Sequence, residues 1–216
     1  MASRVDWNLR ANWDLFYGQT DSATGAVAGY GRDWATDFGR HGLDEPGTSL
    51  NVRADRLLAG FAIVPADRIL IVGSGFGFLI EVLKGRGFPN VWGIDSSSDI
   101  ESRKGVEASG DTVLISEEMS GVGRIKNIMR QQTGGDEFGW IITESVLESW
   151  DDSDNTTLLN VIEGGLSTSA DHAVHLVSEP PFAADVAGVL NEKTLAGWKA
   201  TRPAHSFMSL DTGQVL

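Results

Sequence analysis

The chain has 216 residues, of which 17 are basic and 30 are acidic, so its formal net charge is −13. A surface of that sign repels a phosphate backbone, which disfavours DNA and RNA as substrates. The sequence contains no cysteine, which excludes disulfide bonds and thiolate metal sites and favours the cytoplasm. Residues 1–13 lack the apolar core of a signal peptide, and the longest apolar stretch, residues 57–64, is too short to span a membrane. We therefore expect a soluble protein with one catalytic domain.

The first 60 residues differ in composition from the rest of the chain. They are rich in Gly, Asp, Trp and Tyr, and they show little periodicity apart from an expected helix around residues 8–17. We interpret residues 1–60 as a cap or lid, in which Trp13 and Tyr17 are placed to close over a bound ligand. Residues 61–216 then form a single domain, because no segment within them has the composition of a linker.

Beyond residue 60, short β-branched runs alternate with segments of helical periodicity, which is typical of a parallel sheet with helices on both faces. The expected strands cover residues 68–72, 91–94, 112–116, 140–143 and 173–177. The expected helices cover residues 78–85, 96–108, 122–129, 155–162 and 183–195. The tail is expected to form a hairpin with arms at 205–210 and 214–216, the second arm being unusually short. The predicted fold class is α/β, with a doubly wound, mostly parallel sheet and an N-terminal helical or irregular cap.

The first expected strand runs directly into a turn that has glycine at every second position. The turn consists of Gly73, Ser74, Gly75, Phe76 and Gly77. Glycine lets the backbone approach a ligand without a Cβ in the way, and the helix that follows has free amides in its first turn. A dinucleotide site has the form G-x-G-x-x-G/A, with a small sixth residue beside the pyrophosphate. The sixth residue here is Phe78, which favours a ligand without a pyrophosphate, such as S-adenosylmethionine (SAM).

A carboxylate ends the second expected strand. Asp95 is placed to accept hydrogen bonds from both hydroxyls of a ribose, and Ser96, which follows it, is expected to line the same site. An acidic residue here fits an unphosphorylated ribose and argues against NADP. Taken alone, Asp95 is equally compatible with a cap for the following helix.

These features resemble class I SAM-dependent methyltransferases over residues 68–182. The segments that carry the resemblance are residues 69–77, the glycine motif; 93–95, the ribose-binding strand end; 138–148, the fourth strand with its loop; and 177–180, the end of the fifth strand. The resemblance implies that SAM is the cofactor, that Glu117 or Glu118 lies near the adenine amino group, and that Glu144 lies near the methionine end. Two positions depart from the family pattern, because Ile71 and Gly139 stand where the family has acidic residues.

The expected activity is transfer of a methyl group from SAM to a small molecule or a protein. Such a reaction needs a base only if the acceptor must lose a proton, and the candidates are His205, His172 and Glu144. The sequence leaves the acceptor and the oligomeric state open. Two alternatives remain: a SAM-fold binding or structural protein that has lost catalysis, suggested by Ile71 and Gly139, and a nicotinamide-dependent oxidoreductase, against which the turn sequence argues.

No metal site is expected. His172 and His175 are three residues apart, which on a strand points them to opposite faces. The aspartates at 151, 152 and 154 are better explained as a solvated loop that caps the next helix.

Overall fold

The computed structural model describes residues 49–75, 77–95, 112–114, 137–144, 146–147, 152–166, 172–177, 193–209 and 212–216. Six strands in these residues form one sheet: β1 (Ile69–Val72), β2 (Val91–Asp95), β3 (Thr112–Leu114), β4 (Trp140–Glu144), β5 (Ala173–Val177) and β6 (Ser206–Ser209). Their order is β3-β2-β1-β4-β5-β6, and every neighbouring pair is parallel. The order reverses between β1 and β4, as it does in doubly wound α/β folds.

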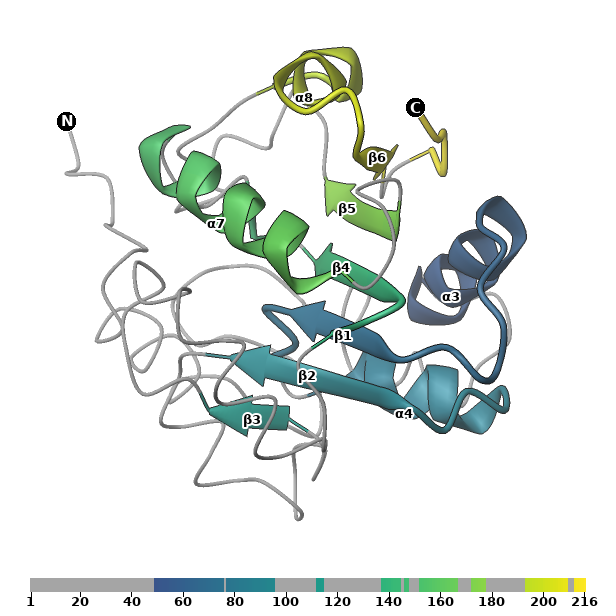
Figure 1. Cartoon of the computed structure of the whole chain (residues 1–216). Coiled ribbons are helices and arrows are strands. Elements are labelled where there is room, and N and C mark those ends of the chain that lie inside the picture. The colour runs from purple at the N-terminus through teal and green to yellow at the C-terminus, as the bar shows by residue number, and fades with distance from the viewer. Residues whose placement is uncertain are drawn as a thin grey trace, which may run out of the picture.

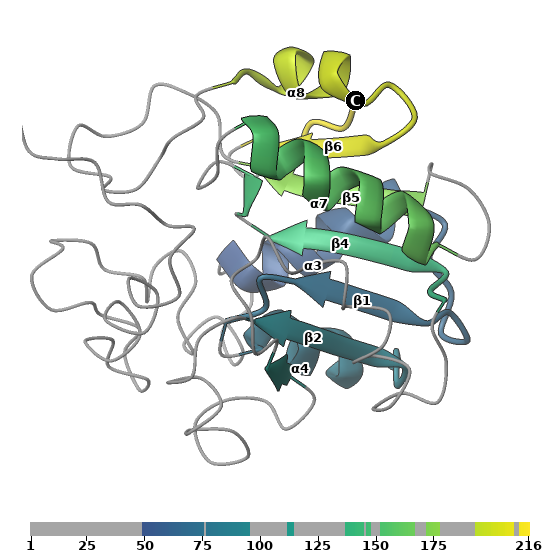
Figure 2. The same ribbon diagram turned by 60° about the vertical axis from the view of Figure 1, so that its left-hand side comes forward.

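Helices cover both faces of this sheet (Figures 1 and 2). One face carries α3 (Ser49–Gly60) and α4 (Phe78–Gly85), and the other carries α7 (Asp152–Gly165) and α8 (Leu195–Thr201). The arrangement confirms the predicted doubly wound α/β class. Among the described residues, none of the helices has the length and apolarity that crossing a membrane requires.

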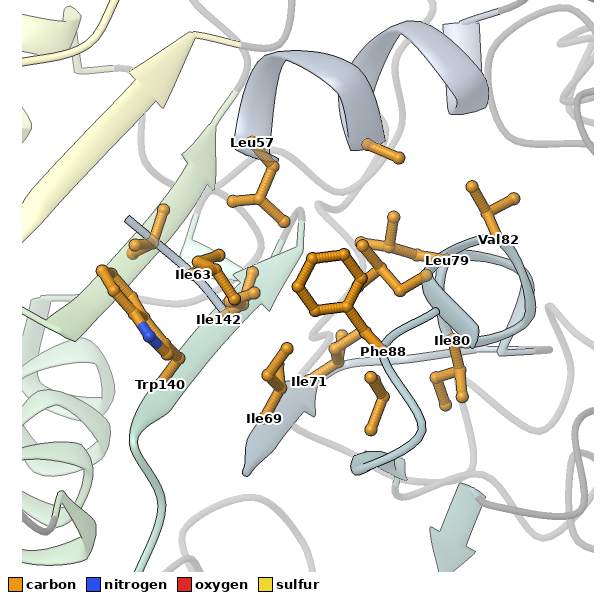
Figure 3. Packing of buried hydrophobic residues seen from close by; sticks show 14 of the residues in the cluster. Leu57, Ile63, Ile69, Ile71, Leu79, Ile80, Val82, Phe88, Trp140 and Ile142 are labelled. Carbon is orange, nitrogen blue, oxygen red and sulfur yellow. The ribbon is translucent and has the colours of Figure 1, made fainter. Parts of the chain in front are cut away.

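The face under α3 and α4 is packed with aliphatic and aromatic side chains from alternate strand positions (Figure 3). Ile69 and Ile71 of β1 are fully buried there, and so is Ile142 of β4. Leu57 of α3 and Leu79 of α4 close over them. The continuous apolar run of β1 is explained by burial on both faces, because its other two residues belong to the second core.

The second core lies under α7 and α8. Leu158 and Ile162 of α7 pack there with Trp198 of α8 and with Phe207 of β6. The rings of Trp198 and Phe207 stack with centroids 6.4 Å apart. This core fixes α8 against the edge strand, so β6 is covered on the face that α8 occupies.

The predicted strands agree with the structure within a residue or two wherever the structure describes them. The predicted helix at residues 155–162 is the centre of α7, which is longer at both ends. The predicted tail hairpin is also present, because Phe207 and Leu216 exchange backbone hydrogen bonds of 2.9 Å in both directions and the second arm is short. The predicted helices at 96–108 and 122–129 lie outside the described residues.

One helix prediction needs correction, and one helix was not predicted. The helix predicted for residues 183–195 does not reach its expected end: Lys193 and Thr194 are not helical, and Leu195 begins α8. The cause is a new helix start, since the Thr194 side chain caps α8 by accepting a hydrogen bond from the Gly197 amide at 3.1 Å. The helix α3 was not predicted at all; it occupies the end of the segment assigned to the cap, and its residues Ala54 and Leu57 belong to the sheet's core.

Candidate functional site

The glycine turn adopts the conformation that its sequence predicts. Gly73, Gly75 and Gly77 have φ angles of 75°, 52° and 77°, in the left-handed region that favours glycine. The turn is fixed to β2 because the amides of Gly73 and Ser74 both donate to the Ile94 carbonyl, at 2.9 and 3.1 Å. Gly77 is the N-cap of α4 and, being glycine, offers no side chain to its first amides. The start of α4 therefore keeps the donors that a nucleotide-type ligand uses.

Two of the glycines are also required by close packing. A Cβ built on Gly73 would lie 2.3 Å from Cγ2 of Val146, in the loop after β4. A Cβ built on Gly93, in the middle of β2, would lie 2.5 Å from Cβ of Ser74. Ser74 is buried against β2. The turn therefore sits tightly between the ends of β2 and β4.

Asp95 joins the turn to the end of β2. Its Oδ2 accepts a hydrogen bond of 2.9 Å from the Gly75 amide, and both residues are buried. The carboxylate that the sequence assigned to the ribose thus lies directly beside the glycine turn, at the carboxyl edge of the sheet. In doubly wound folds, ligands bind at this edge where the strand order reverses, which here is between β1 and β4.

A buried ion pair lies at the end of β4. Arg53 of α3 donates from Nη1 to Oε1 of Glu144 at 2.8 Å, and the side chains are 6% and 10% exposed. Burial raises the pKa of the Glu144 carboxyl, while the charge and hydrogen bond of Arg53 lower it. Glu144 ends β4, and its carbonyl oxygen lies 3.4 Å from the Cβ position of Gly73. The end of β4 therefore lies next to the glycine turn.

Arg53 is the residue that the sequence analysis missed. The available signal was its place in a helical stripe, one residue before Ala54 and four before Leu57, both of which are fully buried. An arginine within an apolar stripe calls for a buried partner. Which carboxylate serves as that partner depends on the packing of α3 against the sheet.

The remaining predicted cofactor residues lie outside the part of the chain that the structure describes. They are Tyr17, Phe76, Ser96, Glu117 and Glu118. Their roles stay predictions. Of the predicted cofactor residues that are described, the structure brings Gly73, Ser74, Gly75, Gly77, Asp95 and Glu144 together at one edge of the sheet.

The two candidate histidines lie at the opposite edge. His172 immediately precedes β5 and stacks on Trp140 with ring centroids 4.4 Å apart, and His205 immediately precedes β6. Because the strands are parallel, residues before a strand lie at the amino edge, away from the glycine turn. The order of residues already contained this signal. Of the three candidate bases, Glu144 alone shares the edge with the turn.

His205 belongs instead to a buried chain of polar contacts under α7 and α8. His175 of β5 lies 2.9 Å from Oγ1 of Thr143 through Nδ1 and 2.8 Å from Nδ1 of His205 through Nε2. His205 Nε2 in turn lies 3.2 Å from Oε1 of Glu163 on α7, at ion-pair distance. Burial lowers the pKa of His205, although Glu163 opposes this shift. The pKa of His175 lies well below its ordinary value, mainly because the side chain is buried and to a smaller extent because His205 lies beside it.

His172 and His175 point to opposite faces, as their spacing predicts. His172 stacks on Trp140, which belongs to the α3/α4 core, whereas His175 contacts Phe207 in the other core. In the residues that the structure describes, no three His, Asp or Glu side chains are grouped so that they could hold a metal ion.

The two departures from the family pattern have different surroundings. Ile71 is fully buried in the α3/α4 core, so its side chain completes the packing under α3. Gly139 precedes β4, and a Cβ there would make only ordinary contacts, the nearest being 3.6 Å from the Arg68 carbonyl. An acidic side chain at position 71 would therefore lie in an apolar core, whereas the surroundings of residue 139 leave room for a side chain.

No protein-family model and no curated protein sequence matches the chain. Solved structures do match it. A SAM-dependent methyltransferase from Archaeoglobus fulgidus is 17% identical, with 56% of this chain and 50% of that chain covered and a TM-score of 0.42. A SAM-dependent methyltransferase from Anabaena variabilis is 13% identical, with 79% of this chain and 61% of that chain covered and a TM-score of 0.48. An amino pentose methyltransferase from Micromonospora echinaspora, solved with SAM, is 18% identical, with 57% of this chain and 49% of that chain covered and a TM-score of 0.42.

These solved structures come from the same class of enzyme that the sequence motifs resemble, the SAM-dependent methyltransferases. The chain spans about half the length of the first structures that it matches. The fold of this chain is defined by the strand order and the register of its six parallel strands.

Proposed function

We infer that this chain binds SAM and transfers its methyl group to a small-molecule or protein acceptor. The observation that carries the proposal is the hydrogen bond from the Gly75 amide to Asp95 at the carboxyl edge of the sheet. In this contact, a glycine turn that lacks the sequence motif of a pyrophosphate site lies beside a carboxylate suited to an unphosphorylated ribose. The enzymatic part of the proposal also draws on the motif resemblance over residues 68–182.

The residues present fit SAM. The glycines leave backbone accessible where a Cβ would otherwise stand, Asp95 would accept from the ribose hydroxyls, and Glu144 would lie toward the amino-acid end. Tyr17, Ser96, Glu117 and Glu118 complete the proposed set, as lid, ribose and adenine contacts. SAM, when bound, supplies a methyl group already activated by its sulfonium charge. The protein's task is to align the acceptor and exclude water.

Of the three candidate bases, Glu144 is the one at the edge of the sheet that carries the glycine turn, because His172 and His205 precede their strands. Burial raises the pKa of the Glu144 carboxyl, and the charge and hydrogen bond of Arg53 oppose that shift. For an acceptor that must lose a proton, we propose Glu144 as the base. Consistent with the charge of −13, we propose that the acceptor is not a nucleic acid, and with no cysteine in the chain we propose a cytoplasmic setting.

A nicotinamide-dependent oxidoreductase is the second candidate, and the strand order favours it. The order β3-β2-β1-β4-β5-β6 with all strands parallel is the strand order of dinucleotide-binding domains. The turn argues against this candidate, because Phe78 stands at the position that a pyrophosphate site keeps small. Strand order alone does not separate the two ligands, so a direct binding comparison is needed.

Calorimetric titration with SAM, S-adenosylhomocysteine and NAD tests the proposal. We expect saturable binding of the first two ligands and none of NAD. Asp95→Asn keeps an acceptor for the Gly75 amide but loses the carboxylate, so SAM affinity should fall about tenfold or more. Asp55→Asn, which changes an exposed carboxylate on α3, is the matched control and should bind normally.

The outcomes separate the candidates. If the protein binds NAD but does not bind SAM, the methyltransferase proposal is wrong and the nicotinamide-dependent oxidoreductase is favoured. Tight binding of S-adenosylhomocysteine with no methyl transfer to any acceptor in a broad screen would instead indicate the degenerate binding protein, which the buried Ile71 motivates. Unchanged SAM affinity in Asp95→Asn would refute the placement of the ribose.

A further inference from the structure

Four polar side chains form a network between the sheet and the helices α7 and α8, and the proposed function uses none of them. Thr143, His175 and His205 are fully buried, whereas the Glu163 side chain is 42% exposed. Thr143 Oγ1 lies 2.9 Å from His175 Nδ1, and His175 Nε2 lies 2.8 Å from His205 Nδ1. His205 Nε2 lies 3.2 Å from Glu163 Oε1. This histidine network therefore leads from the surface of α7 into the core beside β4.

The charge of Glu163 selects one arrangement of hydrogens when both histidines are neutral. A neutral imidazole has one N–H donor and one acceptor nitrogen, and an ionised carboxylate only accepts. Glu163 favours the proton of His205 on Nε2, so His205 Nδ1 accepts from His175 Nε2. His175 Nδ1 then accepts from the Thr143 hydroxyl. Both contacts of His175 are thus hydrogen bonds without a charge on either ring.

The same network has room for one added proton but not for two. A proton on His205 makes both of its nitrogens donors, so His175 must accept at Nε2 and donate from Nδ1 to the Thr143 oxygen. A second proton, on His175, would leave two N–H donors facing each other across 2.8 Å. It would also place two positive charges side by side in an apolar core.

His205 connects this chemistry to the end of α8. Its amide donates to the Arg202 carbonyl at 3.0 Å, and its carbonyl accepts from Lys199 Nζ at 2.7 Å. Among the described residues, the charged groups around its ring come from both helices. Burial lowers the pKa of His205, Glu163 of α7 raises it, and Arg202 and Lys199 at the end of α8 lower it. A displacement of this ring would therefore move the end of α8 and the start of β6 together.

We propose that the histidine network is a pH-sensitive latch that fastens β6 and the end of α8 to β5 and α7. The latch is closed while the network holds no added proton or one, and it opens when both rings become charged. The open state exposes both imidazoles to water and so holds at least one more proton than the closed state, which means that a fall in pH favours opening. The latch does not require SAM binding.

Amide hydrogen exchange followed by NMR tests the latch between about pH 8 and pH 5, the range in which exposed histidines titrate. The amides of β6 report on the latched edge, and those of β1, in the middle of the sheet, correct for the intrinsic effect of pH on exchange. The exchange rate of β6 relative to β1 should rise below about pH 6, approaching tenfold or more per pH unit, because opening takes up at least one proton.

A variant and its matched control identify the groups responsible. His175→Gln keeps a donor and an acceptor but cannot take the second proton, so the relative exchange rate should change by less than about twofold over the same range. His172→Gln is the matched control, because His172 stacks on Trp140 in the other core and lies outside the network. Its β6 amides should show the pH dependence of the unchanged protein.

Imidazole ¹⁵N NMR of the unchanged protein provides a readout that does not depend on a variant. At about pH 8 both His175 and His205 should carry their hydrogen on Nε2, and His175 should stay neutral as long as β6 is protected. A charged His175 in a protein whose β6 is still protected would refute the latch. So would β6 exchange that follows β1 at every pH, or a pH-dependent opening that persists in His175→Gln.

Discussion

Gly73→Ala tests the geometry of the turn most directly. Gly73 has a φ of 75°, and an alanine Cβ there would lie 2.3 Å from Cγ2 of Val146. Real Cβ atoms do not approach a carbon so closely, so the turn or the loop after β4 must move. Val146 is 6% exposed and belongs to the α7/α8 core, so its side chain cannot rotate into solvent.

Two effects add in this variant. A left-handed φ costs an L-residue about 1 to 2 kcal/mol, and forcing a methyl group into a packed core costs about 1 to 3 kcal/mol. We therefore expect the free energy of unfolding to fall by roughly 2 to 5 kcal/mol. Urea unfolding followed by tryptophan fluorescence measures this change through the shift of the midpoint at constant slope.

A control variant and a double mutant show whether the loss of stability comes from the clash with Val146. A Cβ on Gly85, at the end of α4, would have no atom within 4 Å, so Gly85→Ala should change the free energy of unfolding by less than about 1 kcal/mol. Val146→Ala removes the clashing methyl group, so its combination with Gly73→Ala should lose less stability than the two single changes summed. If Gly73→Ala unfolds within about 0.5 kcal/mol of the unchanged protein, our reading of the turn is wrong.

Three other changes test the surroundings of the site. Asp95→Ala leaves the buried Gly75 amide without its acceptor and should lower the free energy of unfolding by about 1 to 3 kcal/mol. Asp95→Asn keeps an acceptor and should lower the free energy of unfolding less, so equal losses in the two variants would contradict the hydrogen bond. His175, whose folded pKa lies well below the ordinary 6.5, should make the protein lose stability as the pH falls below about 6.5, because the unfolded chain binds the proton first. His175 should contribute up to about 1.4 kcal/mol per pH unit to the slope of stability against pH, so urea unfolding at several pH values should show a smaller slope in His175→Gln than in the unchanged protein. Thr194→Ala removes the cap of α8 and should cost about 0.5 to 2 kcal/mol in the same assay, and a smaller effect would mean that the core alone fixes this helix.

The strands and the glycine turn were predictable because their signals are local. A continuous apolar run such as residues 69–72 is stable only when it is buried on both faces, and glycine at alternate positions permits the left-handed φ angles that the turn adopts. The end of α8 was not predictable in the same way. Its start at Leu195 depends on one threonine cap within a segment whose helical pattern continues across it.

What only the tertiary structure decided is which of the charged residues meet. The sequence alone placed Asp95 and Glu144 at the ends of strands, because strand direction follows from the parallel pattern, and the same rule puts His172 and His205 at the other edge. The sequence by itself did not select Arg53 as the partner of Glu144 or connect Glu163 through His205 to His175. Those contacts join helices to strands that are far apart in the chain, and their geometry is set by how side chains fill the two cores, which depends on the whole sheet rather than on any local run of residues.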